Sequence, residues 1–508
     1  MKLNILKYIT LSGALLLAAC SSDYLETEPS DETGVGTVFE TTANAKLAVN
    51  GIARLMTNQH MGSQGFNGEG TIKMYYGNYP GNHFMVGLTG WANVINGNYN
   101  DNTTSIYNYY PWYYYYKLID NANMIINNID DAEGPQNERD YIKAQALTYR
   151  AYSYFMLSQL YGNRWVDSNN GETKALVLRL ESSGESLPLV SLGEIYDQVY
   201  EDLDFAISLF DDADYTRQDN FEIDMSVAQA VYARAALTKQ DYAKAEEYAV
   251  ASRANYPLMN VSQYQEGFAN PTSEWIWSSY GALDETLYFY SYFAYIAYNS
   301  TASAVRTYPK RMSKELYDQV PETDIRKDMF LDPEGFDYNV NTGEAGDDLD
   351  EDARTRYPDL PSNATVYAHM QFKIKANDMP GVGNLNHFRS SELLLIEAEA
   401  KYFLGKEAEA AALLEELTAT TNRDPNYTCT ETGDALFAEI KKYRAIELWG
   451  EGFDWFDAKR WNDPIDRKSV SEGGNFLQAL AVRIEPHEKN KWTWRTPQRE
   501  TDNNDMID

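Results

Sequence analysis

The sequence predicts a mainly α-helical protein with tetratricopeptide-type helix pairs and a loop-rich, irregular region that contains a short strand. Three observations lead to this prediction. Long stretches place apolar residues at helical spacing, two alanine-rich helix pairs have tetratricopeptide spacing, and the region between those pairs is aromatic, acidic and irregular. A chain of 508 residues can bury a core large enough for such an architecture.

The first 19 residues have the pattern of an export signal. Lys2 and Lys7 give a positive start, an apolar run follows at 9–17, and two alanines come next. The run is much shorter than the roughly 20 residues that a helix needs to span a bilayer. We therefore expect residues 1–19 to be a lipoprotein-type signal peptide.

Cys20 is the predicted site of a lipid anchor. The sequence Leu-Ala-Ala-Cys at 17–20 resembles the bacterial lipobox, and the alternative is an ordinary secretory signal with a chance cysteine. Lipoproteins of this class carry several acyl chains on that cysteine, which anchor firmly where one chain does not. Ser21 stands where an aspartate would suggest inner-membrane retention, so we expect the outer membrane, with residues 20–38 as a tether.

The charge of the chain excludes some partners. Lys and Arg total 43 and Asp and Glu 76, a net charge of −33 that becomes −35 when Lys2 and Lys7 leave with the signal. Nucleic acid requires a basic surface, so we expect no nucleic-acid partner. The chain has two cysteines, and with Cys20 lipidated Cys429 has no intramolecular partner for a disulfide.

From Phe39 onward the apolar periodicity predicts helices, whereas residues 58–104 are expected to be loop-rich. Ser191, with Glu194 three residues later, predicts a capping box at the start of one helix. The expected helices lie at 41–56, 112–129, 138–162, 191–210, 225–257 and 390–418, of which the last two are helix pairs.

The two helix pairs are far apart in the sequence, so we expect them not to form one uninterrupted array. The residues between them, 262–388, are interpreted as a large loop-rich insertion. The segment 274–281 within it alternates like a strand, and Trp275 and Trp277 on one strand face are expected in the core. The tail after Glu485 is polar and irregular.

Three further segments resemble one known family. "RSSELLLIEAEAKYFLG" at 389–405, "YRAIELWGEGFDWFDAKRW" at 443–461 and "PWYYYYKLIDNANMII" at 111–126 are similar to motifs of the SusD/RagB-type proteins. The lipobox and the acidic tether fit as well. Two departures are mild: Phe453-Asp454 stands where an Arg or His often precedes the Trp, and Leu118 replaces a small residue.

The resemblance implies a fold, a location and a partner. Members are surface-exposed outer-membrane lipoproteins of Bacteroidetes that lie as lids on TonB-dependent transporter barrels. Their fold is mainly α-helical, with tetratricopeptide-type helix pairs packed against a loop-rich, irregular half with a few short strands. They capture glycans, or in some cases peptides, and are not enzymes. This chain would then consist of an N-terminal helical region at 39–261, the insertion at 262–388, and a C-terminal helical region with an irregular tail at 389–508.

Two irregular, aromatic segments are the predicted ligand-binding regions. A tryptophan or tyrosine stacks on the apolar face of a sugar, while amides bond its hydroxyls. One segment is 90–102 and the other is 285–300. The predicted ligand-binding residues are Trp91, Asn93, Asn96, Asn98 and Tyr99 in the first, and Tyr288, Tyr290, Tyr295 and Tyr298 in the second.

Structural interpretations of the same residues remain open. The Asn-Gly cluster fits turn chemistry, and the tyrosines at 292, 295 and 298 fit one buried helix face. In the family motif, Arg444, Glu447 and Glu451 lie at helical spacing and are interpreted as a structural ion pair over an aromatic core.

The loop 337–348 has a weak resemblance to a calcium loop. Asp337, Asn339 and Asn341 alternate as in an EF-hand, but the glycine falls one position late, at Gly343, and the usual glutamate is absent. A solvated acidic loop is the alternative. We expect no metal site otherwise, because the five histidines are scattered and the chain contains no Cys-x-x-Cys.

The predicted function is glycan capture at the cell surface for a SusC-like TonB-dependent transporter. One alternative keeps the fold and changes the cargo to peptide. A second is a structural or adhesive surface protein. A third is a glycoside hydrolase, for which the sequence contains no recognisable motif. Pairs of acids alone do not indicate one, because they arise by chance among 76 carboxylates.

Overall fold

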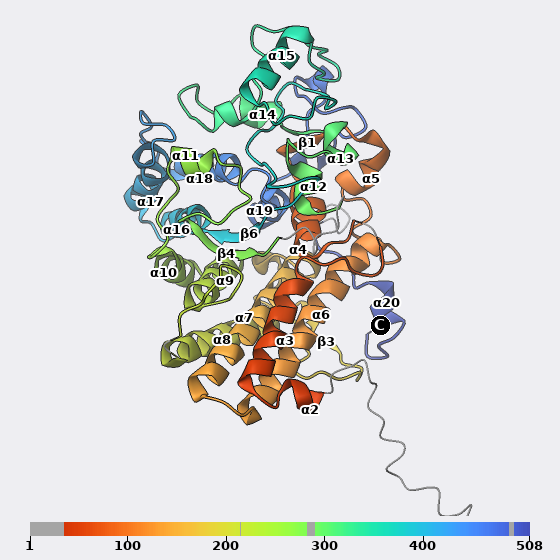
Figure 1. Cartoon of the computed structure of the whole chain (residues 1–508), viewed down its shortest axis with the longest axis vertical. Coiled ribbons are helices and arrows are strands. Elements are labelled where there is room, and N and C mark those ends of the chain that lie inside the picture. Colours follow the sequence, from red (N-terminus) through yellow and green to blue (C-terminus); the bar gives the residue numbers. More distant parts are fainter. Residues whose placement is uncertain (1–34, 64, 214, 282–289, 487–491, 508) are drawn as a thin grey trace, which may run out of the picture.

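The structure is a computed structural model that describes residues 35–63, 65–213, 215–281, 290–486 and 492–507. Cys20 and Tyr288 lie outside the described residues. The fold is mainly α-helical with a few short two-stranded sheets, as the sequence predicts (Figure 1). Among the described residues, no helix has both the length and the apolar character needed to cross a membrane.

The longer helices build the left and lower parts of the molecule in Figure 1. They are α3 (Thr42–Leu55), α6 (Ile106–Asn128), α7 (Gln136–Tyr161), α8 (Leu192–Ala213), α9 (Met225–Lys239), α10 (Tyr242–Arg253), α16 (Ser390–Phe403), α17 (Glu407–Glu415), α18 (Gly433–Glu447) and α19 (Asp454–Trp461).

Short helices lie mostly in the connecting segments, together with α15 (Asp347–Arg356). They include α2 (Val35–Val38), α4 (Gly68–Thr71), η2 (Ile72–Asn78), η3 (Thr89–Trp91), α5 (Ala92–Ile95), η4 (Ile129–Asp131), η5 (Trp165–Asp167), α11 (Val261–Tyr264), α12 (Tyr292–Ile296), α13 (Ser303–Arg306), α14 (Lys314–Tyr317), η6 (Lys327–Met329), η7 (Glu416–Thr420), η8 (Val470–Glu472) and α20 (Gln498–Thr501).

The strands form antiparallel pairs that join distant parts of the chain. Each of the predicted core tryptophans on β4, Trp275 and Trp277, is 1% exposed, which confirms that prediction. The pairs are β1 (Phe84–Val86) with β5 (Lys310–Met312), β2 (Lys174–Val177) with β3 (Leu189–Ser191), β4 (Trp275–Ser279) with β6 (Leu385–Arg389), and β7 (Ile465–Asp466) with β8 (Arg483–Ile484).

Local sequence signals explain where several helices begin. The Thr41 hydroxyl caps α3 by accepting from the Asn44 N–H at 3.2 Å. At α8 the predicted capping box is confirmed, because the Ser191 hydroxyl accepts from the Glu194 N–H at 3.2 Å and the Glu194 carboxylate accepts from the Ser191 N–H at 2.8 Å. Helix α6 begins at Ile106, earlier than predicted, because Ser105 caps it.

The prediction of a loop-rich segment over 58–104 is wrong for its middle part. Residues 68–78 form the buried helical turns α4 and η2. Two glycines make this close packing possible. A Cβ on Gly68 would lie 1.9 Å from the Met56 carbonyl oxygen, and one on Gly77 would lie 2.0 Å from the Gly452 carbonyl oxygen.

The two helix pairs are separated in the sequence, but the expectation that they do not form one array is wrong for their packing. Helix α10 packs directly on α16, so the row α7, α8, α9, α10, α16 and α18 continues across the insertion (Figure 1). The β4–β6 pair brings the two ends of the insertion together, and the chain therefore re-enters the helical row where it left.

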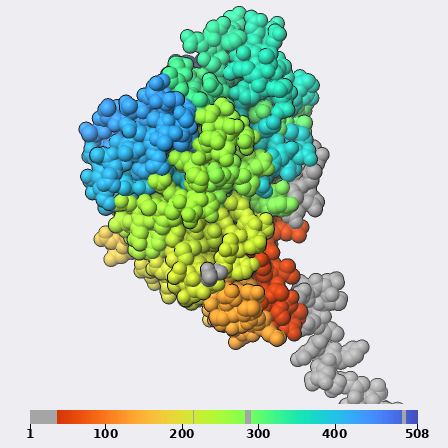
Figure 2. Space-filling model, turned by 60° about the vertical axis from the view of Figure 1, so that its left-hand side comes forward, coloured from red at the N-terminus to blue at the C-terminus, as the bar shows by residue number. Residues whose placement is uncertain are grey.

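The insertion at 262–388, called the central region below, covers one end of the helical row. Figure 2 shows its green-to-cyan residues over the top of the molecule, with the blue C-terminal helices beside them. This region has a small core of its own, in which Leu331, Leu349, Val366 and Phe372 are buried. Its described part is thus an irregular but packed unit.

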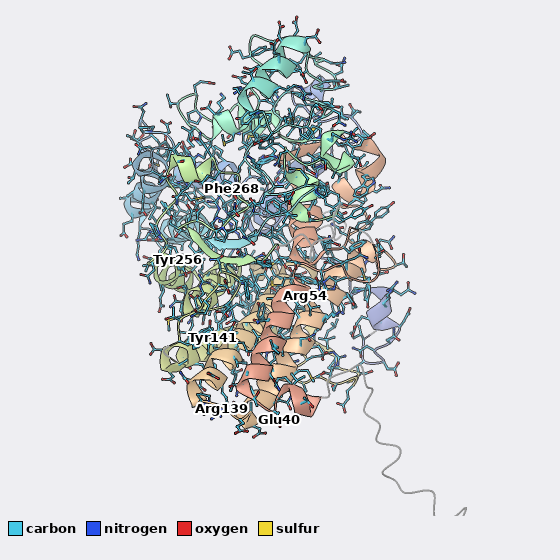
Figure 3. The ribbon with its side chains drawn as sticks, in the orientation of Figure 1. Glu40, Arg54, Arg139, Tyr141, Tyr256 and Phe268 are labelled. Atoms are coloured by element: carbon cyan, nitrogen blue, oxygen red, sulfur yellow. The ribbon has the colours of Figure 1, made fainter. Side chains whose placement is uncertain are left out.

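A buried cluster of charges joins the helical row to the central region. Arg389 donates to Glu447 at 2.8 Å and to Glu451 at 2.8 Å, and Lys373 donates to Glu451 at 2.7 Å. The aromatic ring of Phe268, labelled in the upper half of Figure 3, lies 4.8 Å from the Lys373 ammonium. The motif acids are therefore structural, as expected.

The motif arginine has a different partner from the one its spacing suggests. Arg444 donates to Asp457 of α19 at 2.7 Å, whereas Glu447 and Glu451 pair with Arg389. Helical spacing brings side chains to one face, but here the two acids pair with cations from other elements, Arg389 and Lys373. Burial raises the pKa of Glu447, and the charges of Arg423, Arg389 and Arg326 outweigh it and hold that pKa well below its usual value.

Candidate functional site

The two predicted ligand-binding segments meet in the structure. The Trp91 ring, at the junction of η3 and α5, lies 6.5 Å from the ring of Tyr295 in α12, centroid to centroid. Tyr290 continues the contact, 6.3 Å from Tyr295. Figure 1 shows α5 and α12 on the same side of the molecule. Residues about 200 positions apart in sequence thus form one aromatic cluster.

Two further tyrosines, Tyr75 and Tyr107, contact this cluster. Tyr75 of η2 donates its hydroxyl to the Tyr295 hydroxyl at 2.9 Å, and its ring lies 6.1 Å from Trp91. Tyr107 of α6 lies 6.0 Å from Tyr75 and stacks on Tyr99 at 5.6 Å. Neither tyrosine was predicted as part of the site, because Tyr75 lies in the supposed loop and Tyr107 precedes the predicted helix start.

The upper surface of the cluster is open to solvent. Trp91, Tyr99 and Tyr290 are half-buried, whereas Asn93 and Asn98 are exposed. The Asn93 amide donates to the Tyr99 hydroxyl at 3.1 Å, and the Asn98 amide donates to the Asn93 side-chain oxygen at 3.1 Å. We call these five residues the Trp91 platform. They combine ring faces with oriented amides.

The loop that carries the platform is held by a buried arginine. Arg467 donates to the Asn96 side-chain oxygen at 2.9 Å and to the Ile95 carbonyl at 3.1 Å. Asn96 is 7% exposed, and its amide also donates to the Ala479 carbonyl at 3.3 Å. Asn96 thus supports the loop from within, and a ligand contact at this residue stays a prediction. The turn passes through Gly97 at φ 66°.

Of the remaining predicted tyrosines, Tyr298 is not brought to the platform. Tyr298 is 7% exposed and packs in the central-region core, 5.1 Å from Phe372 and 5.7 Å from Tyr357. A ligand contact at Tyr298 stays a prediction without support from its surroundings. Tyr288 lies outside the described residues. Tyr295 is 6% exposed and forms the base of the cluster.

The three phenols of Tyr75, Tyr107 and Tyr295 stay neutral in the physiological range. Burial raises the pKa of Tyr295 to about 12, although its hydrogen bond with Tyr75 lowers it. Burial also raises the pKa of Tyr107 and raises that of Tyr75 well above its ordinary value. Neutral hydroxyls both donate and accept hydrogen bonds, which suits an uncharged polyhydroxylated ligand.

The loop with the EF-hand-like spacing forms a tight turn. The Asn339 side chain accepts from the Asn341 N–H at 3.0 Å, and the Asn339 N–H donates to the Glu344 carbonyl at 2.8 Å. Helix α15 begins at Asp347. Within the described residues, no group of three or more His, Cys, Asp or Glu is arranged to hold a metal ion.

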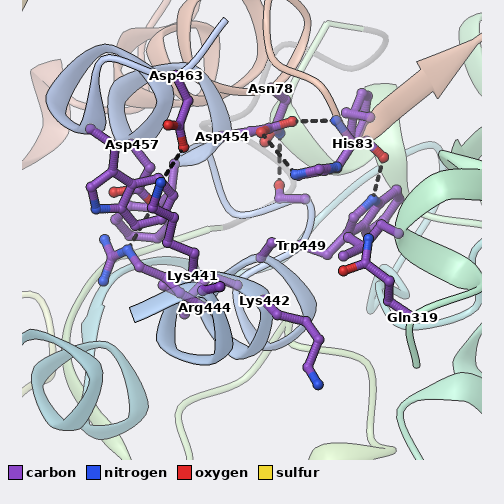
Figure 4. Close-up of a pocket in the computed structure, with 18 of the residues that line it drawn as sticks. Asn78, His83, Gln319, Lys441, Lys442, Arg444, Trp449, Asp454, Asp457 and Asp463 are labelled. Atoms are coloured by element: carbon purple, nitrogen blue, oxygen red, sulfur yellow. Dashed lines mark hydrogen bonds and ion pairs between the residues drawn. The ribbon is translucent and has the colours of Figure 1, made fainter. Parts of the chain in front are cut away.

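A cavity of about 290 Å³ lies elsewhere, between α18, α19 and α14 (Figure 4). Its floor is apolar and includes Trp449 and Leu448. Four of its charged side chains pair with one another, since Lys441 lies 2.6 Å from Asp463 and Arg444 lies 2.7 Å from Asp457. None of the predicted ligand-binding residues lines it.

The fold and the open aromatic surface define a helical-repeat protein with a candidate binding platform. Residues 235–507 match the SusD family, and residues 23–237 match a SusD-like family described as starch-binding and associating with the outer membrane. The first match alone covers more than half of the chain. The chain therefore belongs to the SusD/RagB family, as the sequence motifs indicated.

Individual relatives are distant but span nearly the whole chain. SusD-like protein P2 of Formosa agariphila is 23% identical over 487 residues, which cover 89% of this chain and 90% of that protein. A SusD-like carbohydrate binding protein from Bacteroides vulgatus has a TM-score of 0.73 at 23% identity, covering 92% of this chain and 98% of that one. Surface glycan-binding protein A from Bacteroides thetaiotaomicron has a TM-score of 0.65 at 18% identity, with coverage of 92% and 98%. These structural likenesses show the fold.

Proposed function

We propose that this chain is a surface lipoprotein that binds glycans on the Trp91 platform and delivers them to a SusC-like TonB-dependent transporter. The observation that carries the proposal is the meeting of the segments around Trp91 and Tyr290–Tyr295, with rings and amides open to solvent. Family membership and the names of two structural relatives, one a carbohydrate binding protein and one a glycan-binding protein, support it.

The platform has the chemistry that a sugar chain requires. A sugar ring presents an apolar face of C–H groups that packs against an aromatic ring, and hydroxyl edges that bond to amides. Trp91 and Tyr290 offer rings, and Asn93 and Asn98 lie beside them at the edge. Contacts of this kind are individually weak, which suits a protein that must release its cargo.

Affinity electrophoresis tests the binding role. Residues 21–508 are run in native gels that each contain one polysaccharide from a panel of host and plant glycans. We expect retardation by one class of glycan and its loss in Trp91→Ala. Phe205→Ala, which removes an equally aromatic side chain 45% exposed on α8, is the matched control. Binding of a peptide library with no retardation by any glycan would instead favour peptide cargo.

The absence of turnover belongs to the same proposal. The glycan that retards the chain is incubated with it, and the length distribution of the glycan is measured afterwards. We expect no shortening, because the proposal gives the platform a binding role without a nucleophile or an acid–base pair. Release of reducing ends would contradict it.

The membrane anchor and the transporter are tested separately. Cys20→Ala is expected to release the protein from the outer-membrane fraction, and unchanged fractionation would contradict the lipid anchor. A TonB-dependent barrel is expected to co-purify from extracts in mild detergent. Its absence would favour a structural or adhesive role.

A further inference from the structure

A second, larger cleft lies under the C-terminal segment. It has a volume of about 720 Å³ and lies between residues 492–507, the end of α7 and strand β2. Helix α20 borders it on the right-hand side of Figure 1. Sites for small ligands in proteins commonly measure about 300–1,000 Å³, so the cleft is large enough for several sugar units.

The cleft and the Trp91 platform share one loop. Thr103 directly follows the segment 90–102, which carries Trp91 and is called the platform loop. It lines the cleft, and its carbonyl accepts from the Gln498 N–H at 3.0 Å. Arg495 also lines the cleft and donates to the Asp101 carbonyl at 3.0 Å. The segment that follows Tyr99 therefore leads from the platform to the edge of the cleft.

Cations outnumber carboxylates in the lining of the cleft, although the whole molecule is acidic. The chain carries −33, yet the charged residues lining the cleft are three cations, Arg164, Lys174 and Arg495, and one carboxylate, Asp167. The Arg495 side chain is 60% exposed and Lys174 is exposed. Arg164 and Asp167 pair with each other at 2.7 Å. Arg495 also has a carboxylate partner, because its guanidinium lies 3.4 Å from Asp101. Among the described residues, Lys174 is therefore the cation of the lining that no carboxylate pairs with.

An unpaired buried donor adds a second kind of observation. Trp492 lines the cleft and is 3% exposed, and its indole N–H has no acceptor among the described residues. A buried donor without an acceptor costs about 1–3 kcal/mol, so a ligand oxygen that accepts from this N–H would stabilise the site. Hydroxyl side chains of Thr493 and Thr496 lie in the same lining.

We propose that this cleft is a subsite for glycans that carry acidic groups, carboxylates or sulfates, and that it extends the Trp91 platform. The inference rests on the proposed glycan-binding function and narrows its substrate class. A surface of −33 repels polyanions at long range, so an acidic chain requires a local cation, which Lys174 supplies in this cleft. The Lys174 ammonium suits both groups, because it is a point charge with three hydrogen-bond donors.

A matched set of probes and variants tests the cleft. The probes are dextran, dextran sulfate and polygalacturonate in affinity gels, at 50 mM and 500 mM salt. The variants are Lys174→Glu and Gln498→Ala, neither of which removes a hydrogen bond of the side chain to the described residues. Lys375→Glu, a reversal at a cation 39% exposed in the central region, controls for net charge.

We expect one or both acidic probes to retard the chain far more than dextran, and salt to weaken that retardation. Lys174→Glu should reduce the affinity at least fivefold and Gln498→Ala about twofold, whereas Lys375→Glu leaves it within twofold. Equal effects of Lys174→Glu and Lys375→Glu, or no retardation by either acidic probe, would overturn the proposal.

The two proposals fail in different ways. Binding of a neutral glycan that is lost in Trp91→Ala and unchanged in Lys174→Glu would leave the platform in place and refute the acidic subsite. Acidic binding that is lost in Lys174→Glu and unchanged in Trp91→Ala would refute the extension from the platform. Weakening by both variants, with the same acidic probe, is the result that supports the inference.

Discussion

Two aromatic clusters of this protein have similar composition and opposite surroundings. Around Glu69, the hydroxyls of Tyr152, Tyr115 and Tyr114 donate to one buried carboxylate at 2.6, 3.1 and 3.3 Å. Each of these residues is no more than 2% exposed. At the Trp91 platform, in contrast, the rings are half-buried and the amides beside them face solvent.

The difference shows that the partner of an aromatic residue, rather than its type, indicates its role. The rings around Glu69 are covered on all sides, and their polar groups are satisfied within the chain. The platform residues keep part of their ring surface exposed, and the amides of Asn93 and Asn98 lie at the protein surface. With 40 tyrosines in the chain, an abundance of aromatic residues does not by itself identify a site.

The largest effect is expected at the buried cluster. Glu69→Ala leaves three buried hydroxyls without their acceptor, at about 1–3 kcal/mol each, so the free energy of unfolding should fall by about 3 kcal/mol or more. Denaturant titration followed by circular dichroism measures this loss. Glu69→Gln keeps an acceptor oxygen and should lose clearly less. Equal losses in the two variants would show that the hydroxyl–carboxylate bonds are not what stabilises the cluster.

A smaller effect, on affinity alone, is expected at the platform. Trp91→Ala removes the central exposed ring and should cost about 2 kcal/mol of binding free energy, which is roughly thirtyfold in Kd. Its unfolding free energy should stay close to that of the wild type. Titration calorimetry with the retarding glycan measures the affinity. An unchanged Kd in a folded Trp91→Ala protein would remove Trp91 from the site.

The two asparagines of the platform loop separate binding from support. Asn93→Ala removes an exposed amide and should weaken binding about fivefold, near 1 kcal/mol, with unchanged stability. Asn96→Ala removes a buried acceptor of Arg467 and should lower the thermal midpoint of the protein as well. Thermal melts and calorimetry on the pair test this. A stability loss in Asn93→Ala that equals the one in Asn96→Ala would contradict the assignment.

The smallest effect is the dependence on pH. Burial raises the pKa of Glu69, outweighing the hydrogen bond from Tyr152 and the charge of Lys73, which lower it. A folded pKa above the unfolded value of about 4.3 means that the native state holds the proton longer, so stability falls as the pH rises between those two values. The stability of the wild type relative to Glu69→Gln should therefore decrease from pH 4 upward.

Affinity for a neutral glycan should not follow this trend. Burial raises the pKa of Tyr295 to about 12 and raises that of Tyr107, so these two phenols keep their protons between pH 5 and 9. Calorimetry across that range should give a constant Kd. A Kd that changes tenfold would place a titrating group in the site.

Local features of the fold could be predicted from the sequence, and long-range ones could not. The capping box at Ser191 and the helix pair at 225–257 depend on residues a few positions apart, and both are confirmed. The packing of α10 on α16 and the pairing of Arg389 with Glu447 depend on parts of the chain that sequence spacing does not relate.

The same limit applies to the site. Trp91 and the 285–300 segment were predicted separately from ring and amide chemistry, but nothing in the sequence indicated that they touch. Tyr75 was missed because Gly68 and Gly77 turn an apparent loop into buried helical turns. Asn96 and Asn98 look alike in the sequence, and only the position of Arg467 separates a buried support from an exposed amide.

The most direct test of the central claim is a crystal structure of residues 21–508 with the glycan that retards the chain most strongly. The account predicts a sugar ring packed against the Trp91 indole, with hydroxyls bonded to Asn93 or Asn98. A sugar bound solely in the cavity between α18 and α19, with the Trp91 ring still open to solvent, would contradict it.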